Sequence, residues 1–262
     1  MKMMPDTTIR IANAEAVSLG LDVDAPITAV RLLPRFGETR CLPLDSDGLF
    51  EFPTFTSPNT VKLEWLETSG SKEAAFTSQA EIVSRHYFTL KQLRNLNPEQ
   101  DGFDDENEYP DELLNEARQA ATDVFEEAAH RSFVHRIGRT KDYGRDSLVN
   151  LAHCDVYEVL SEGYVQVSDN QLERDQTAAP MPFPRWIEYL YGSDQMPAEV
   201  SRAVLELAAY TLRPSNRPVG ATGESTDAGY IHFTTAGRDG ATSIPEVNAA
   251  IAQFGWGCQY VW

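Results

Sequence analysis

The sequence is poor in cysteine, in long apolar runs and in positive charge, and each shortage narrows the class of protein. Only three cysteines occur in 262 residues, and they lie far apart at Cys41, Cys154 and Cys258. An odd and scattered set argues against a disulfide framework and fits a reducing cytoplasm. No run approaches the roughly 18 consecutive apolar residues of a membrane span, and no apolar signal segment follows the N-terminus. We therefore expect neither a membrane protein nor a secreted one.

The charge is strongly acidic. Lysine and arginine number 22 against 40 aspartates and glutamates, which gives a formal net charge of −18. Such a chain repels duplex DNA at long range, and this speaks against a sequence-reading protein with a basic patch. Acidity serves solubility, and it also suits a surface that DNA must pass without adhering. The content of hydrophobic residues, 42%, is typical of a globular protein with one large or two small domains.

Motifs for catalysis or metal binding are missing as well. The five histidines are scattered, and His130 and His135 do not share a helix face as the two ligands of a zinc protease must. We expect them to be surface or capping histidines. The glycine-rich stretch from Gly220 lacks the lysine and hydroxyl of a phosphate loop, and no Gly-x-Ser-x-Gly elbow occurs. The sequence thus predicts no enzyme, no catalytic, metal-binding or cofactor-binding residue, and no cofactor.

Residues 1–84 have the pattern of a small β-sandwich. Val61–Leu66 alternates apolar and polar residues, the period of a strand with one buried face. Other short runs are rich in β-branched or aromatic residues and are separated by turn residues. These runs are Thr8–Ile11, Ile27–Leu33, Gly48–Phe52 and Ala80–Val83. Short antiparallel strands at this spacing are typical of a sandwich.

From residue 85 onward the pattern becomes helical. Thr89 is a suitable N-cap for a short helix, and apolar spacing predicts a long helix over 110–131 and another from Pro197 to before Pro214. Ser243–Glu246 has the form of a capping box before a last helix. Strands are expected between the helices at 149–151, 155–160, 164–167, 186–191 and 230–234. The predicted fold class is α+β, with a β-rich accessory domain over 1–84 and a mainly helical domain with short strands over 85–262.

Two charged segments are candidate surfaces. The first is an acidic linker that lacks the register of a calcium loop, so we predict a solvated acidic loop. Its carboxylates are Asp101, Asp104, Asp105, Glu106 and Glu108. The second is a basic loop over 131–145, which is either a solvated helix C-terminus or a contact for an acidic neighbour. Arg136, Arg139 and Lys141 are its candidate interface residues.

The C-terminus is unusually aromatic. Trp256, Tyr260 and Trp262 follow Phe254 within nine residues, with glycines between them. Chain ends are normally polar, so aromatic anchors there either fold back onto their own core or dock into another subunit. We predict docking, with these three residues in a portal or subunit interface.

Several segments, taken in order, resemble the head-to-tail connector adaptors of tailed bacteriophages, in particular siphovirus-like phages of actinobacteria. The segments are Val61–Trp65 at the end of the β-domain, Glu81–Arg94, Tyr109–Pro110 with Glu116–Arg118 and Phe125–Phe133, Trp186–Gly192 with Met196–Val200, and Ala236–Gly240 with Ile244–Asn248. Two stretches have no counterpart in that family. They are Asp169–Pro184 and the aromatic tail after Phe254.

The resemblance implies a structural virion protein without catalysis. It would form a homo-oligomeric, dodecameric ring beneath the portal, extend the DNA channel and join the head to the neck or tail. The implied partners are the chain itself, the portal protein, and a stopper or tail-terminator. DNA would pass without sequence-specific binding, past an acidic channel surface, and no membrane would be involved. The implied location is the virion neck, with assembly in the host cytoplasm.

Two other interpretations stay open. Another neck component, a stopper or tail-terminator, would be dominated by strands, and the two long helices speak against it. A β-sandwich carbohydrate-binding protein could use Trp65, Trp186 and Trp256 as sugar-stacking platforms, but no signal peptide directs the chain to polysaccharides. A hydrolase is a more distant third.

Overall fold

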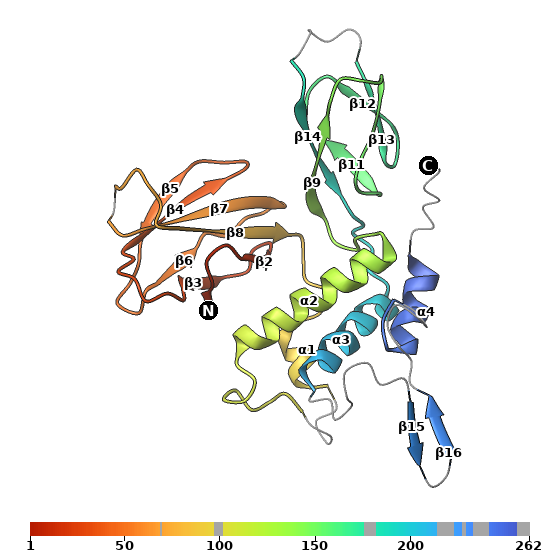
Figure 1. The fold of residues 1–262 in the computed structure, drawn as a ribbon. Coiled ribbons are helices and arrows are strands. Elements are labelled where there is room, and N and C mark those ends of the chain that lie inside the picture. The colour runs from red at the N-terminus through yellow and green to blue at the C-terminus, as the bar shows by residue number, and fades with distance from the viewer. Residues whose placement is uncertain are drawn as a thin grey trace. The chain divides into compact units, whose positions relative to one another are not determined.

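A computed structural model describes residues 1–68, 70–96, 102–175, 182–213, 223–226, 229–232 and 241–255 (Figure 1). The chain divides into two compact units. The first combines Met1–His86 with Ser132–Asp194, and the second combines Tyr87–Arg131 with Gln195–Trp262. The predicted fold class, α+β, is confirmed.

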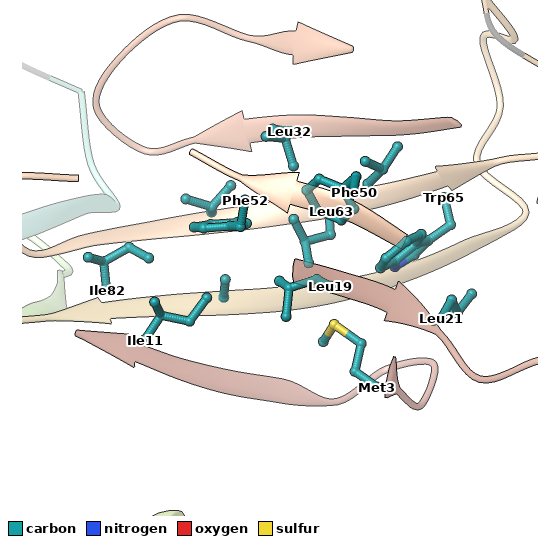
Figure 2. Close-up of a cluster of buried hydrophobic side chains, with 13 residues drawn as sticks. Met3, Ile11, Leu19, Leu21, Leu32, Phe50, Phe52, Leu63, Trp65 and Ile82 are labelled. Atoms are coloured by element: carbon teal, nitrogen blue, oxygen red, sulfur yellow. The ribbon is translucent and has the colours of Figure 1, made fainter. Parts of the chain in front are cut away.

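The first unit begins with two β-sheets that share one core. The smaller sheet has the order β1 (Lys2–Met3), β3 (Val17–Leu21), β6 (Leu49–Phe52). The larger sheet has the order β2 (Thr8–Ala12), β8 (Phe76–Val83), β7 (Asn59–Leu66), β4 (Ala29–Pro34), β5 (Arg40–Pro43). Figure 2 shows Leu19 and Phe50 of the smaller sheet among Leu32, Leu63 and Trp65 of the larger one. The predicted run of N-terminal strands is thus confirmed, and β1, β3 and β5 are additional.

Strand β7 carries the centre of this core. Its alternation places Val61, Leu63 and Trp65 fully inside, because successive side chains of a strand point to opposite faces. The Trp65 indole N–H donates to the buried Ser78 hydroxyl at 2.7 Å, so burial leaves no polar atom of the ring unsatisfied. The indole also meets Phe50 edge-on, with ring centroids 5.8 Å apart. Trp65 is therefore a core residue.

The first unit continues with two three-stranded sheets. One has the order β11 (Val156–Val159), β14 (Arg185–Tyr191), β9 (Arg136–Asp142). The other has the order β10 (Leu148–Asn150), β13 (Gln171–Arg174), β12 (Tyr164–Ser168). The predicted basic loop over 131–145 is wrong over 136–142, which form β9 and pair antiparallel with all of 185–191. Backbone pairing with an apolar partner strand makes this polar run a strand.

The second unit contains α1 (Leu90–Arg94), α2 (Asp111–Ala129), α3 (Ala198–Leu212), α4 (Pro245–Phe254) and a hairpin of β15 (Gly223–Thr226) and β16 (Gly229–His232). Helix α3 packs between α2 and α4, as Figure 1 shows. Within the described residues, no helix is long and apolar enough to cross a bilayer. The long predicted helices are confirmed to within two residues at each end.

The predicted helix cap is confirmed for α1 and is wrong for α4. The Thr89 hydroxyl accepts a hydrogen bond from the backbone N–H of Gln92, and the Gln92 side-chain carbonyl accepts one from the backbone N–H of Thr89. These two bonds complete a capping box on α1. No such box forms at Ser243. Helix α4 follows Ile244, whose N–H donates to the Thr242 hydroxyl, and Asn248 holds the Thr242 backbone at 2.8 and 2.9 Å. Thr242 and Asn248 thus fix the chain where it enters α4, while the N-cap residue Ile244 makes no side-chain cap bond.

The structure can be compared with the predicted domains, 1–84 and 85–262, in strand content and in the position of the boundary. The region after residue 84 contains six strands between Arg136 and Tyr191, more β-structure than a mainly helical domain with short strands implies. The predicted boundary at 84 lies near the change of unit after His86, but residues 132–194 belong to the first compact unit. Independent folding of 1–84 and 85–262 stays a prediction.

Candidate assembly surfaces

One face of β9 and β14, together with the turn after β9, carries exposed cations over exposed aromatic rings. Lys141 lies opposite Trp186 in the strand register, and the Arg139 guanidinium lies 4.5 Å from the centroid of the Trp186 ring. The Lys141 ammonium is 5.3 Å from the ring of Tyr143, and the Arg145 guanidinium is 5.9 Å from it. We call these five residues the basic–aromatic strip. Cation–π attraction holds the three charges on the rings.

The strip keeps two of the three predicted basic interface residues. Arg139, Lys141 and Arg145 have no carboxylate within 4.0 Å in the described parts of the chain. Arg136, in contrast, donates to both carboxylate oxygens of the half-buried Glu81 at 2.6 and 2.9 Å. It joins β9 to β8 inside the first unit, so its geometry is that of a structural ion pair.

Glu81 stays ionised in spite of its burial. Burial alone would raise its pKa, but the charges of Arg136 and Arg10 outweigh that effect and lower the pKa. Arg10 adds a third hydrogen bond, at 3.0 Å, from β2. A carboxylate with several charge-assisted bonds is strongly held, and removal of one partner leaves the others buried without compensation.

A second carboxylate fixes the chain at the end of β9. Asp142 is 3% exposed and accepts two bonds from the Arg174 guanidinium, at 2.6 and 2.9 Å, and one from the Tyr164 hydroxyl at 2.7 Å. The Gly144 amide supplies a fourth bond at 2.8 Å. Burial would raise the pKa of Asp142, but the bonds from Arg174, Gly144 and Tyr164 lower it to about 2. This network ties β9 to β12 and β13 and sets the turn that presents Tyr143.

The opposite face of β9 packs against a histidine. A Cβ atom at Gly138 would lie 2.5 Å from the Tyr189 ring and 2.9 Å from His153 Nδ1, so only glycine fits there. His153 Nδ1 is 2.8 Å from the Tyr189 hydroxyl, and its ring stacks on Tyr191 at 3.9 Å. Burial first, and then the charge of Arg136, lowers the pKa of His153 to about 4. The prediction of only surface or capping histidines is wrong for His153. It holds for His130, which is exposed and ends α2 in the left-handed region.

The acidic candidates lie in the second unit. Asp104, Asp105, Glu106 and Glu108 are all exposed, and we call them the acidic segment. Asp101 lies outside the described residues. A backbone bond from Asn107 is the main cause that lowers the pKa of Asp105. Whether these carboxylates face a channel stays a prediction.

Arg94 of α1 fixes both ends of the acidic segment. Its guanidinium donates to the carbonyl of Phe103 at 2.8 Å and to that of Tyr109 at 3.0 Å. Phe103 is fully buried and meets the Tyr109 ring edge-on at 5.0 Å. The four carboxylates thus project from a turn whose two ends are anchored.

The remaining candidates separate into buried, exposed and undescribed ones. Trp65 has no exposed surface, so its proposed use as a sugar-stacking platform is wrong. Trp186 is 47% exposed but carries Arg139 on its ring. Trp256, Tyr260 and Trp262 lie outside the described residues, and their docking stays a prediction. Within the described residues, no three His, Cys, Asp or Glu side chains are grouped to hold a metal.

Comparisons with known proteins give structural similarities only. No protein-family model matches the sequence, and no curated protein matches it. The neck of an empty gene transfer agent particle, computed with C6 symmetry, aligns with a TM-score of 0.42 and 19% identity over 64% of this chain and 89% of the other. A virion structure of a native gene transfer agent particle aligns with a TM-score of 0.36 and 14% identity over 52% of this chain and 83% of the other.

Proposed function

We propose that this chain is a structural neck protein of a tailed-phage-like particle, a head-to-tail adaptor that forms a ring beneath the portal. The observation that carries the proposal is the ordered resemblance of several segments to such adaptors. These segments fall on the junctions of the fold. Glu81–Arg94 runs from β8 into α1, Trp186–Gly192 runs to the end of β14, Met196–Val200 opens α3, and Ile244–Asn248 opens α4. The two similar solved structures, a neck and a virion, are of the same class, but the proposal does not rest on them.

The charge of the chain suits this role. A ring of identical subunits repeats every surface around one axis, so the carboxylates on a channel-lining surface recur with every copy, and the net charge of −18 means that the chain has carboxylates in excess. Like charge keeps the DNA backbone off the wall and lowers friction during genome ejection. The role needs no chemistry, since the protein holds its neighbours and lets DNA pass.

The proposed partners are further copies of the chain, the portal above the ring, and a stopper or tail-terminator below it. The aromatic tail over Gly255–Trp262 docks on the portal in this proposal, because aromatic side chains each bury roughly 150–250 Å² and dominate interface energetics. The protein is then found in the virion neck after assembly in the host cytoplasm.

The test uses tail-less, portal-bearing heads of the virus that encodes the chain. Electron microscopy of heads mixed with the purified protein is expected to show an added collar at the portal vertex. Deletion of Gly255–Trp262 is expected to abolish the collar and leave the melting temperature of the free protein nearly unchanged. Full-length protein that never binds heads would contradict the adaptor role. A truncated protein that melts much lower would place the tail in its own core.

A stopper or tail-terminator is the second candidate, and the six strands between Arg136 and Tyr191 favour it more than the sequence suggested. The same images separate the two roles. An adaptor contacts the portal directly, whereas a stopper or terminator binds only after another protein has formed the collar.

A further inference from the structure

A closed ring of identical subunits needs two different surfaces on each chain, because every head-to-tail contact joins one surface to its complement on the next copy. We propose that the basic–aromatic strip of one copy binds the acidic segment of the adjacent copy. The inference rests on the proposed ring and names the contact that closes it.

The basic–aromatic strip has the composition of a contact surface. Its three cations have no carboxylate partner in the described chain, although acidic residues outnumber basic ones by 40 to 22. Trp186 and Tyr143 leave 47% and 60% of their surface exposed. Arginine, tryptophan and tyrosine are the residues most enriched at the energetic centres of interfaces. The rings also hold the cations in place, which lowers the entropy lost on binding.

The acidic segment is the complement on the same chain. Its four carboxylates are exposed and form no ion pair with a described cation. Arg94 fixes the two ends of the segment through the carbonyls of Phe103 and Tyr109, so the carboxylates are presented by an ordered turn. Each copy thus carries three cations and four carboxylates that form no ion pair within the described residues, and both groups are preorganised.

A carboxylate partner fits the strip better than a nucleic acid. The phosphate backbone meets the field of the whole chain, and a net charge of −18 repels it. An acidic protein segment, unlike a nucleic acid, can present several carboxylates from one short turn and can also pack apolar atoms against Trp186 and Tyr143. A second copy supplies such a segment at every position of a ring.

Charge exchange tests the contact with the full-length protein. The strip variant is Arg139→Glu, Lys141→Glu and Arg145→Glu, and the segment variant is Asp104→Lys, Asp105→Lys, Glu106→Lys and Glu108→Lys. Self-association is measured by sedimentation velocity at about 0.1 M and about 1 M salt. Each variant alone is expected to weaken association about a hundredfold or more at the lower salt, since like charges then meet across the interface.

Rescue identifies the partner. An equimolar mixture of the two variants, and a chain that carries both sets, are expected to associate within about tenfold of the wild type, because each contact again joins opposite charges. The matched control reverses three exposed cations outside the strip, Lys2→Glu, Arg40→Glu and Lys72→Glu, with the same change of net charge. It is expected to associate like the wild type. If a charge-reversed variant melts lower, neutral Gln and Asn substitutions replace it and give a smaller loss.

Three results would overturn the inference. They are a strip variant that associates normally, a mixture that shows no rescue, and a wild-type chain that stays monomeric up to about 1 mM. Failure of the proposed function is a separate result, because it is read from binding to heads. Protein that binds heads without charge rescue keeps the adaptor role and loses this contact. Protein that shows rescue but never binds heads supports the contact between copies and contradicts the adaptor role.

Discussion

The first compact unit has two parts, the N-terminal sheets and the strands over 136–191, and each part is stabilised internally by different interactions. Between the N-terminal sheets the core is apolar, centred on Leu63 and Trp65, and its stability follows from buried area. The strands over 136–191 have a smaller apolar cluster and depend on polar networks at Asp142 and His153. An apolar core has no titratable group at its centre, whereas a network of charges and hydrogen bonds responds to pH. The first part is thus the more robust, and the second the more sensitive to conditions.

The two parts also differ in what they leave exposed. Seven of the twelve large exposed hydrophobic side chains in the described residues lie between 143 and 186. They are Tyr143, Leu148, Tyr157, Val165, Val167, Phe183 and Trp186. Apolar groups concentrated on one part of a surface mark interaction sites. The region over 136–191 thus exposes more large apolar side chains than the N-terminal sheets do.

The largest expected effect is in the apolar core. Trp65→Ala removes a fully buried ring and orphans the Ser78 hydroxyl, and it is expected to cost about 3–5 kcal/mol of unfolding free energy. Urea unfolding followed by circular dichroism measures it. Trp186→Ala is the matched control and should cost less than about 1 kcal/mol, because that ring is exposed. Equal losses for the two tryptophans would refute the contrast between the parts.

A pH effect of intermediate size is expected at His153. The pKa of His153 in the folded protein is about 4, below the usual value of 6.5, so folding favours the neutral form of the imidazole. The stabilisation is complete above pH 6.5 and is lost as pH falls toward 4, by up to about 3 kcal/mol at 1.36 kcal/mol per unit. Unfolding experiments across this window, with His153→Phe as the comparison, should show a steeper loss of stability with falling pH in the wild type than in the variant. A wild-type curve that is flat between pH 6.5 and 4 would contradict the buried, neutral ring.

The smallest effect is expected at Asp142. Asp142→Asn keeps the shape but weakens the bonds to Arg174 and Tyr164, which should cost about 1–3 kcal/mol at neutral pH. The lowered pKa of the wild-type carboxyl means that its stabilisation is present above about pH 4 and is lost as pH falls through about 2. The difference between variant and wild type should therefore shrink in acid. A difference that stays constant down to pH 2 would mean that the carboxylate charge contributes nothing.

Local patterns made much of the fold predictable. Alternation identified β7, apolar spacing identified α2 and α3, and Thr89 marked the start of α1. Each of these signals lies within a few neighbouring residues. Strand β9 gave no such signal, because Arg-Ile-Gly-Arg-Thr-Lys-Asp becomes a strand only through its pairing with β14.

The candidate site was predictable in composition but not in geometry. The basic run and the acidic run are visible in the sequence, and Arg139, Lys141 and the four carboxylates of the acidic segment are exposed. Their use in contacts stays a prediction. The sequence could not separate Arg136, bound to Glu81, from Arg139 and Lys141, because the difference depends on a residue far away along the chain. Trp65 and Trp186 likewise look equivalent until burial distinguishes them.

The central claim, a neck adaptor that forms a ring on the portal, is tested most directly by the mass of the complex. Purified portal rings of the same virus are mixed with an excess of the chain and weighed by native mass spectrometry. We expect one dominant complex whose added mass corresponds to a dodecamer of the chain, with no stable intermediate of a few copies. Portal rings that gain no mass, or that gain single copies without a closed set, would contradict it.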